Sequence, residues 1–342
     1  MRRLILCGCL VLAGCGGGAV PPAAGPPLPP LIADRPQSAT PAAPEARDDP
    51  SMVEGVSLFG EALYRRVLPA EVRTEREARL AEAQAAVEAR PDDPDALLWQ
   101  GRRLAYLERY REAVEVFGRG VARFPDDARF LRHRGHRYLD LRRFDLAAAD
   151  LEQAVRLIAG KPDEPEPSGL PGSAQPAYTL HANVWYHLGL ARYLNGDDAG
   201  AAEAFRESLA LARQPDPLVA SSQWLYMSLR RLKRDDEARR LLDPVTNDMT
   251  VLENRPYHWL LLMEKGQMPP ESLLGFVGED DFDPSTLGYG VGAWYLAAGK
   301  QEEAVRLFRL VLSRGQWMAF GHIAAEADLK RLGLAPRVGK AE

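Results

Sequence analysis

The sequence predicts an all-α protein built as a solenoid of stacked helix-turn-helix repeats. The first observation behind this prediction is a self-match at a period of 34 residues in the first half of the chain. At this period Gly101 aligns with Gly135, and Ala113 aligns with Ala147. The second observation is that the recurring residues are small, as close packing of two antiparallel helices requires. The third is Pro125, which follows a helix and stops it. An ordinary helical bundle with chance periodicity is the alternative.

The recurring residues resemble the tetratricopeptide repeat (TPR). One copy carries Gly101, Ala113, Phe117, Gly120 and Pro125, and the next carries Gly135, Ala147, Leu151 and Ala154. The resemblance implies a right-handed helical solenoid in which the first helix of each pair lines a concave face. Such faces commonly bind an extended peptide or a partner helix.

The chain from residue 51 to residue 332 is expected to form an N-terminal cap followed by a solenoid. Residues 51–93 are predicted to be N-terminal capping helices, at 52–67 and 70–90, because the terminal repeats of solenoids are often atypical. The TPR-like solenoid is predicted to occupy residues 94–332. Its two clearest repeats are 94–127 and 128–161.

The second half of the solenoid is less regular. A third repeat starts near Ala182, and a fourth surrounds Trp224. In the fourth, Tyr226 stands where a small residue is expected, which predicts a more open helix pair. The remaining predicted elements are helical segments in 256–276, a last repeat around Gly292, a closing helix at 316–332 and a tail at 333–342.

An insertion at 161–177 separates the second and third repeats. It holds five prolines and three acidic residues, a composition that excludes a helix. Connections of this length in a compact domain are usually functional or disordered, and the sequence leaves both interpretations open.

The N-terminus has the features of a lipoprotein signal peptide at residues 1–14. A basic start at Arg2 and Arg3 precedes a short apolar run and the residues Leu-Ala-Gly-Cys, which end at Cys15. This ending resembles the bacterial lipobox, which implies that Cys15 is acylated, for example with palmitate, and becomes the first residue of the mature chain. An ordinary signal peptide is the alternative. The other two cysteines leave with the signal, so no disulfide within the mature chain is expected.

Residues 15–50 are predicted to be a disordered tether behind the acylated cysteine. They are rich in Gly, Pro and Ala and have few large apolar side chains. Gly16 follows Cys15 where an aspartate would favour the inner membrane, so the resemblance to bacterial lipoproteins implies lipid anchoring in the outer membrane, facing the periplasm. The formal charge of −5 gives no reason to expect nucleic acid as a partner.

The helical phase places nine residues on the predicted concave face. They are Arg102, Tyr106, Arg129, Arg132, His136, Tyr186, Tyr193, Gln223 and Met227. Between Gly101 and Arg143 there are 12 arginines, no lysine and 6 acidic residues. We interpret this excess as a groove for a protein or peptide with an anionic segment, because the planar guanidinium pairs well with carboxylates. The alternative is that these arginines form solvated helix faces and intramolecular pairs, as a general bias toward arginine would favour. The Lys and Asn pattern of chaperone-binding carboxylate clamps is absent.

His133 and His136 lie three residues apart on one predicted helix, a spacing that brings two imidazoles to one face. A metal-binding protein or hydrolase that uses the His136 region and the 161–177 loop is therefore an alternative function. The surrounding arginines disfavour a cation, so no metal site is predicted. A glycan or peptide receptor is a further alternative.

No catalytic motif is found. The sequence lacks a nucleophile elbow, a phosphate-binding loop and a dinucleotide fingerprint, so neither an enzyme nor a cofactor is expected. The sequence therefore predicts a lipid-anchored scaffold of the bacterial cell envelope. It would bind protein or peptide partners through its concave face and concentrate them near the membrane.

Overall fold

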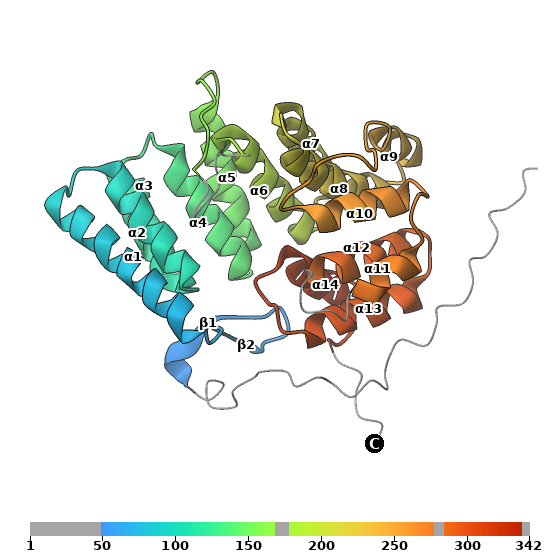
Figure 1. Ribbon diagram of the computed structural model, residues 1–342, viewed down its shortest axis with the longest axis horizontal. Helices are drawn as coiled ribbons and strands as arrows, with labels where there is room; N and C mark the ends of the chain where they lie inside the picture. The colour runs from blue at the N-terminus through green and yellow to red at the C-terminus, as the bar shows by residue number, and fades with distance from the viewer. Residues whose placement is uncertain (1–48, 168–177, 277–283, 337–342) are drawn as a thin grey trace, which may run out of the picture. The chain divides into compact units, whose positions relative to one another are not determined.

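Helices make up almost every element of the structure (Figure 1). The computed structural model describes residues 49–167, 178–276 and 284–336, all within one compact unit. The predicted all-α repeat architecture is confirmed. In chain order the helices are α1 (Ala70–Ala89), α2 (Pro94–Tyr106), α3 (Tyr110–Arg123), α4 (Ala128–Asp140), α5 (Phe144–Ile158), α6 (Leu180–Asn195), α7 (Asp198–Leu211), α8 (Pro215–Arg231), α9 (Asp235–Leu241), α10 (Arg255–Glu264), α11 (Pro270–Phe276), α12 (Pro284–Ala297), α13 (Gln301–Ser313) and α14 (Phe320–Arg331).

Consecutive helices pack in pairs, α2 with α3, α4 with α5, α6 with α7, α8 with α9 and α12 with α13. The first helices of the first two pairs begin at aspartates, Asp93 and Asp127, whose carboxylates accept a bond from a backbone N–H two residues later. Such caps satisfy N–H groups that have no partner inside the helix. The pairs stack on one another, and Leu97, Phe117 and Phe130 are central to the core of the first repeats.

In four pairs a glycine of the first helix lies against a large apolar side chain sixteen residues later. These are Gly101 with Phe117, Gly135 with Leu151, Gly189 with Phe205, and Gly292 with Phe308. A Cβ atom on Gly101 would stand 2.3 Å from Cε1 of Phe117, far inside van der Waals contact. Glycine is therefore the residue that lets these helix pairs cross.

Seven residues after this crossing position, each pair turns through a left-handed backbone. Gly196 and Gly299 occupy the turn in two pairs, with φ of 88° and 78°. Glu108, Arg142 and Lys233 occupy it in the other three, with φ of 58°, 59° and 59°. A residue with a Cβ atom costs roughly 1–2 kcal/mol in this conformation, so three turns carry charged side chains at a conformational cost.

The fourth pair, α8 and α9, departs from the pattern. Tyr226 occupies the crossing position, seven residues before Lys233, and α9 has only 7 residues. The Tyr226 side chain is buried, and its hydroxyl accepts a hydrogen bond from Nη1 of Arg230 at 3.0 Å. A tyrosine cannot occupy the gap that a glycine leaves, so this pair cannot cross as closely as the other four.

The N-terminal part differs from the sequence-based expectation. The helix predicted at 52–67 is wrong, because this segment forms a short 3-10 turn, η2 (Pro50–Met52), and an antiparallel hairpin of β1 (Val53–Val56) and β2 (Ala62–Tyr64). Two β-branched valines favour a strand over a helix. The hydroxyl of Ser57 accepts bonds from two backbone N–H groups of the loop, and Gly60 has φ of 84°. The second expected helix is present as α1.

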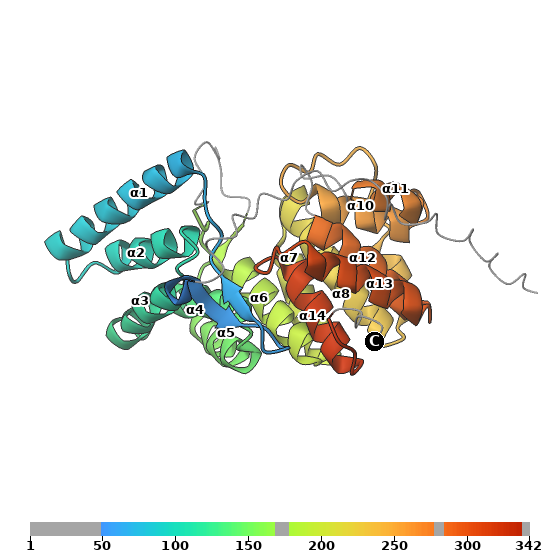
Figure 2. The same cartoon turned by 90° about the horizontal axis from the view of Figure 1, so that it is seen from below.

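The hairpin and the segment that runs from Trp317 into α14 both contact the turns of the first two repeats (Figures 1 and 2). Nη2 of Arg142, at the second turn, donates to Oε2 of Glu326 on α14 at 2.8 Å. Nη2 also donates to the carbonyl of Trp317 at 2.8 Å. The Trp317 indole N–H donates to the carbonyl of Tyr64 in β2 at 2.7 Å. Contacts between residues far apart in sequence therefore join the second turn, α14 and the hairpin.

Several predicted features lie outside the described residues. These are the signal peptide at 1–14, Cys15, the tether as far as residue 48, the loop at 168–177 and the tail from residue 337. Among the helices that are described, none has both the length and the apolar composition needed to cross a membrane.

Candidate functional site

The nine predicted partner-binding residues lie on the first helices of the repeats, α2, α4, α6 and α8. Six are buried: Arg102, Arg132, Tyr186, Tyr193, Gln223 and Met227. Three are half-buried: Tyr106, Arg129 and His136. The expected open concave face is therefore largely covered by other parts of the chain. Partner binding by these residues stays a prediction.

A segment of the insertion covers the arginine-rich part of this face. Glu166 lies against α4, with Oε2 at 3.2 Å from Nε of Arg132. The same oxygen accepts a hydrogen bond from Nδ2 of Asn183 on α6 at 2.7 Å. Arg102 on α2 donates from Nη2 to the carbonyl of Pro167 at 2.7 Å and to the hydroxyl of Tyr106 at 3.1 Å. The chain's own acidic segment thus joins the first helices of three repeats.

His133 completes this contact in a defined tautomer. Nη1 of Arg132 lies 2.9 Å from Nδ1 of His133, and an arginine can only donate. Nδ1 therefore accepts, and the proton is on Nε2, which lies 3.1 Å from Oε1 of Glu166. Burial and the charge of Arg132 lower the pKa of His133 to about 3, so its imidazole is neutral. Burial alone would raise the pKa of Glu166, but Arg132 and His133 hold it below its usual value.

His136 lies in an aromatic cluster rather than with acidic groups. Its ring centroid is 4.4 Å from that of His187 and 5.4 Å from that of Phe320 on α14. The Tyr186 ring also faces Phe320. Burial lowers the pKa of both histidines well below its usual value. Within the described residues no group of three His, Cys, Asp or Glu side chains is placed to hold a metal ion.

Arg129 lies apart from these contacts, at the start of α4. Its guanidinium pairs with Asp127 and with Asp95 of the preceding repeat, each at 2.6 Å. Gln223 and Met227 lie further along the stack, on α8. The structure therefore divides the predicted face into an arginine-rich part near α2 and α4 and a second part near α8.

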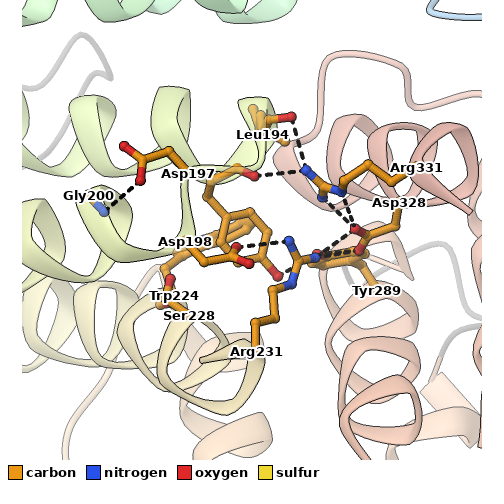
Figure 3. Close-up of polar contacts among 11 residues, drawn as sticks. Leu194, Asp197, Asp198, Gly200, Trp224, Ser228, Arg231, Tyr289, Asp328 and Arg331 are labelled. Carbon is orange, nitrogen blue, oxygen red and sulfur yellow. Dashed lines mark hydrogen bonds and ion pairs between the residues drawn. The ribbon is translucent and has the colours of Figure 1, made fainter. Parts of the chain in front are cut away.

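The second part borders a charge network around the buried carboxylate of Asp328 (Figure 3). Arg231 of α8 donates from Nη2 to both carboxylate oxygens of Asp328 on α14, at 2.7 and 2.6 Å. Its Nη1 lies 3.3 Å from Asp198 of α7. Tyr289 of α12 donates to the same Asp328 at 2.9 Å. The carboxylate of Asp328 therefore links α8, α12 and α14.

Arg331 extends the network to the end of α6 (Figure 3). Its Nη1 donates to the carbonyls of Tyr193 and Leu194 at 3.1 and 3.3 Å. These are among the last carbonyls of a helix, which have no partner inside it. Two arginines and two carboxylates balance each other here, and every charged group of the network is paired.

A cavity of about 310 Å³ opens beside this network. Residues from α8, α10, α12 and α14 line it. The residues of chemical interest that sequence reasoning missed are Glu264, Trp294, Lys233 and Arg230. The signal that could have found the site is Tyr226 at the glycine position, since this residue lines the cavity.

Comparison with known proteins supports the repeat fold. Residues 100–165 and 175–216 match the family model of the tetratricopeptide repeat. None of the curated proteins matches the sequence significantly.

Three solved structures match parts of this chain. A MamA RS-1 ArsTM double mutant is 21% identical, with 57% of this chain and 87% of that chain covered and a TM-score of 0.39. YrrB, described as a TPR protein with an unusual peptide-binding site, is 13% identical, with 74% and 98% covered and a TM-score of 0.39. The Naa15/Naa10 complex bound to HypK-THB is 16% identical, with 71% and 35% covered and a TM-score of 0.34. With these low scores, the three carry no argument about function.

The family match covers about a third of the chain. The crossing glycines and left-handed turns extend the same construction to α12 and α13. In fold the described part of the chain is thus built largely of tetratricopeptide-type helical repeats.

Proposed function

We propose that this protein is a lipid-anchored scaffold of the bacterial outer membrane that binds an acidic peptide segment of a partner protein. The binding surface is the arginine-rich inner face formed by α2, α4 and α6. The acylated Cys15 and the tether hold this surface near the membrane and raise the local concentration of the partner.

The observation that carries the binding proposal is the contact of Glu166 and Pro167 with the inner face. The carboxylate of Glu166 forms an ion pair with Arg132 and accepts a hydrogen bond from Asn183. The backbone carbonyl of Pro167 accepts a hydrogen bond from Arg102. These are the groups that any acidic peptide presents. A partner segment with the same groups fits the same donors.

The partner must compete with the chain's own segment. A competitor in the same chain acts at an effective concentration on the order of millimolar. Weakening that competitor therefore strengthens partner binding, whereas removing a shared donor weakens the competitor and the partner alike and brings no such gain. A gain on weakening the competitor separates this site from any other surface of the protein.

The test is crosslinked affinity capture of the lipidated protein from envelopes, with quantitative mass spectrometry. Glu166→Gln removes a charge-assisted contact of the competitor and is expected to raise partner recovery, by roughly tenfold in affinity. Arg102→Gln weakens both segments and is expected to bring no such rise. Arg119→Gln, on the exposed side of α3, is the matched control and leaves recovery unchanged. If Glu166→Gln recovered partners like the wild type, the proposed surface would be wrong.

Anchoring is tested separately. Metabolic labelling with a clickable palmitate analogue is expected to mark the wild-type protein but not Cys15→Ser. Membrane fractionation is expected to place the wild type in the outer membrane. An unlabelled wild-type protein, or label retained in Cys15→Ser, would contradict the lipid anchor and leave the binding proposal intact.

A further inference from the structure

The cavity beside α8 has the size and lining of a small ligand site. Its volume of about 310 Å³ lies at the lower end of the range for such sites. Met227, Ala293 and Leu296 supply apolar surface, and Trp294 and Tyr226 supply aromatic rings. The contacts of Glu166 described above involve none of these residues, so this cavity is separate from the surface proposed to bind a partner protein.

Glu264, the last residue of α10, lines this cavity and carries an oxygen without a partner. Its Oε1 accepts a hydrogen bond from Nε2 of Gln223 at 3.0 Å. Its Oε2 is inaccessible to solvent and has no hydrogen-bond partner among the described residues. The carboxyl group must therefore turn toward the cavity to meet a ligand, and a donor-rich group such as an ammonium or a guanidinium then satisfies it.

Lys233 presents the opposite charge at the opening. It is exposed, and no acidic side chain among the described residues lies within ion-pair distance of its ammonium group. The three arginines of the lining are all paired: Arg231 and Arg331 with Asp328, and Arg230 with Asp235 at 2.9 Å. Among the described residues, the charged groups of this cavity that form no ion pair are therefore one carboxyl inside and one ammonium at the rim.

We propose that the cavity binds a basic amino acid, lysine or arginine, either free or as the C-terminal residue of a peptide. The side-chain cation binds the carboxylate of Glu264. The alkyl stem lies along the Trp294 ring, which also favours a nearby cation through its π face. The α-carboxylate binds the ammonium of Lys233 at the rim. The carboxylate of Glu264 and the ammonium of Lys233 thereby each obtain a partner.

Burial raises the pKa of Glu264 well above its usual value, although Gln223 and Arg230 oppose this effect. The raised pKa favours the protonated form of this carboxyl group when no cation is bound. A bound cation favours the ionised form, so binding releases a proton. Proton release is a readout that a nonspecific contact with Lys233 does not produce.

The test is isothermal titration calorimetry of the full-length lipidated protein in detergent, with L-arginine and L-lysine as probes. Agmatine lacks the carboxylate and L-norleucine lacks the side-chain cation. Both are expected to bind at least tenfold more weakly than the better basic amino acid. Titration in Tris and in phosphate buffer is expected to give different heats, in proportion to the proton released.

Two peptides distinguish the source of the ligand. Gly-Gly-Arg with a free carboxylate is compared with the same peptide carrying a C-terminal amide. Binding of the free-acid peptide but not of free arginine identifies a peptide C-terminus, and tighter binding of free arginine identifies the amino acid. If neither amino acid nor the free-acid peptide binds, or if norleucine binds equally well, the proposal is overturned.

Matched variants assign the binding to the two groups. Glu264→Gln keeps an acceptor for Gln223 but removes the charge, and it is expected to lose at least tenfold in affinity and all proton release. Lys233→Gly removes the ammonium without strain at its left-handed backbone and is expected to lose several-fold. Glu253→Gln, an exposed change just before α10, leaves affinity unchanged. Unchanged affinity in Glu264→Gln would overturn the assignment.

Discussion

The first two repeats and the fourth differ in what the charged side chain at the turn between their two helices contacts. Glu108, Arg142 and Lys233 occupy equivalent left-handed positions. In the first two repeats the charged side chain is buried and binds a distant part of the chain, Arg66 for Glu108 and Glu326 for Arg142. In the fourth repeat Lys233 is exposed beside a cavity. The comparison indicates that these turns are attachment points, of which one remains available to a ligand.

The residue at the position where the two helices cross also differs between these repeats. Gly101 and Gly135 let the first two pairs close tightly, whereas Tyr226 prevents this in α8 and α9. The tight pairs leave no room between their helices. In this fourth pair α8 borders the cavity that Glu264 lines. The crossing position therefore holds a packing glycine in the first two repeats and a side chain that lines the cavity in the fourth.

The largest expected effect comes from breaking the attachment at Arg142. Arg142→Met leaves the buried carboxylate of Glu326 without its partner, which costs about 3–5 kcal/mol. Urea unfolding measures the loss. The double variant Arg142→Met with Glu326→Leu is expected to recover most of it, because no unpaired charge remains. A single variant as stable as the wild type would show that this turn does not hold the C-terminal helix.

The next effect tests the crossing glycines. Gly101→Ala forces Cβ into the Phe117 ring and is expected to destabilise by about 1–3 kcal/mol. Gly118→Ala in α3 is the control, since its Cβ would meet only Nη1 of Arg134 at 3.6 Å. That change is expected to stabilise by up to about 1 kcal/mol through helix propensity. Thermal unfolding of both variants checks the opposite signs.

The two regions are expected to respond oppositely to pH. His136 and His187 have lowered pKa values in the folded protein, so their contribution is present above about pH 6.5 and is lost as the pH falls. Each can remove up to about 1.4 kcal/mol per pH unit. Glu264 has a raised pKa, so its contribution is present below about pH 4.5 and is lost as the pH rises.

Calorimetric unfolding between pH 4 and 8 separates these contributions. His136→Phe keeps the aromatic packing and is expected to flatten the loss of stability on acidification. Glu264→Gln is expected to flatten the loss on raising the pH. Identical pH profiles for the wild type and both variants would contradict the neutral burial of these groups.

The smallest effect compares the turns directly. Lys233→Gly relieves left-handed strain while increasing the entropy of the unfolded chain, for a net gain of up to about 1 kcal/mol. Arg142→Gly relieves the same strain but loses the buried ion pair and is expected to destabilise. Chemical denaturation of the two variants gives opposite signs if the turns differ only in their partners. A loss of stability in Lys233→Gly would indicate a structural contact for that side chain.

The repeat architecture could be predicted from the sequence because its contacts are local. Gly101 meets Phe117 sixteen residues away, and the same spacing recurs in Gly189 and Phe205. Pairs at a fixed short spacing leave a periodic pattern that a single sequence shows. The same pattern showed that Tyr226 stands where the other repeats have a small residue.

Other features were decided only by the tertiary structure. The hairpin at 53–64, the contact of Glu166 with Arg132, and the pairing of Arg142 with Glu326 join residues at separations that follow no period. Whether Glu264 ends without a partner depends on how α8 and α10 meet, which local pattern does not specify. The sequence by itself determined how neighbouring helices pair, because that packing is repeated and short-range. The tertiary structure decided what covers the inner face and where a cavity remains, because these depend on the summed geometry of all the repeats.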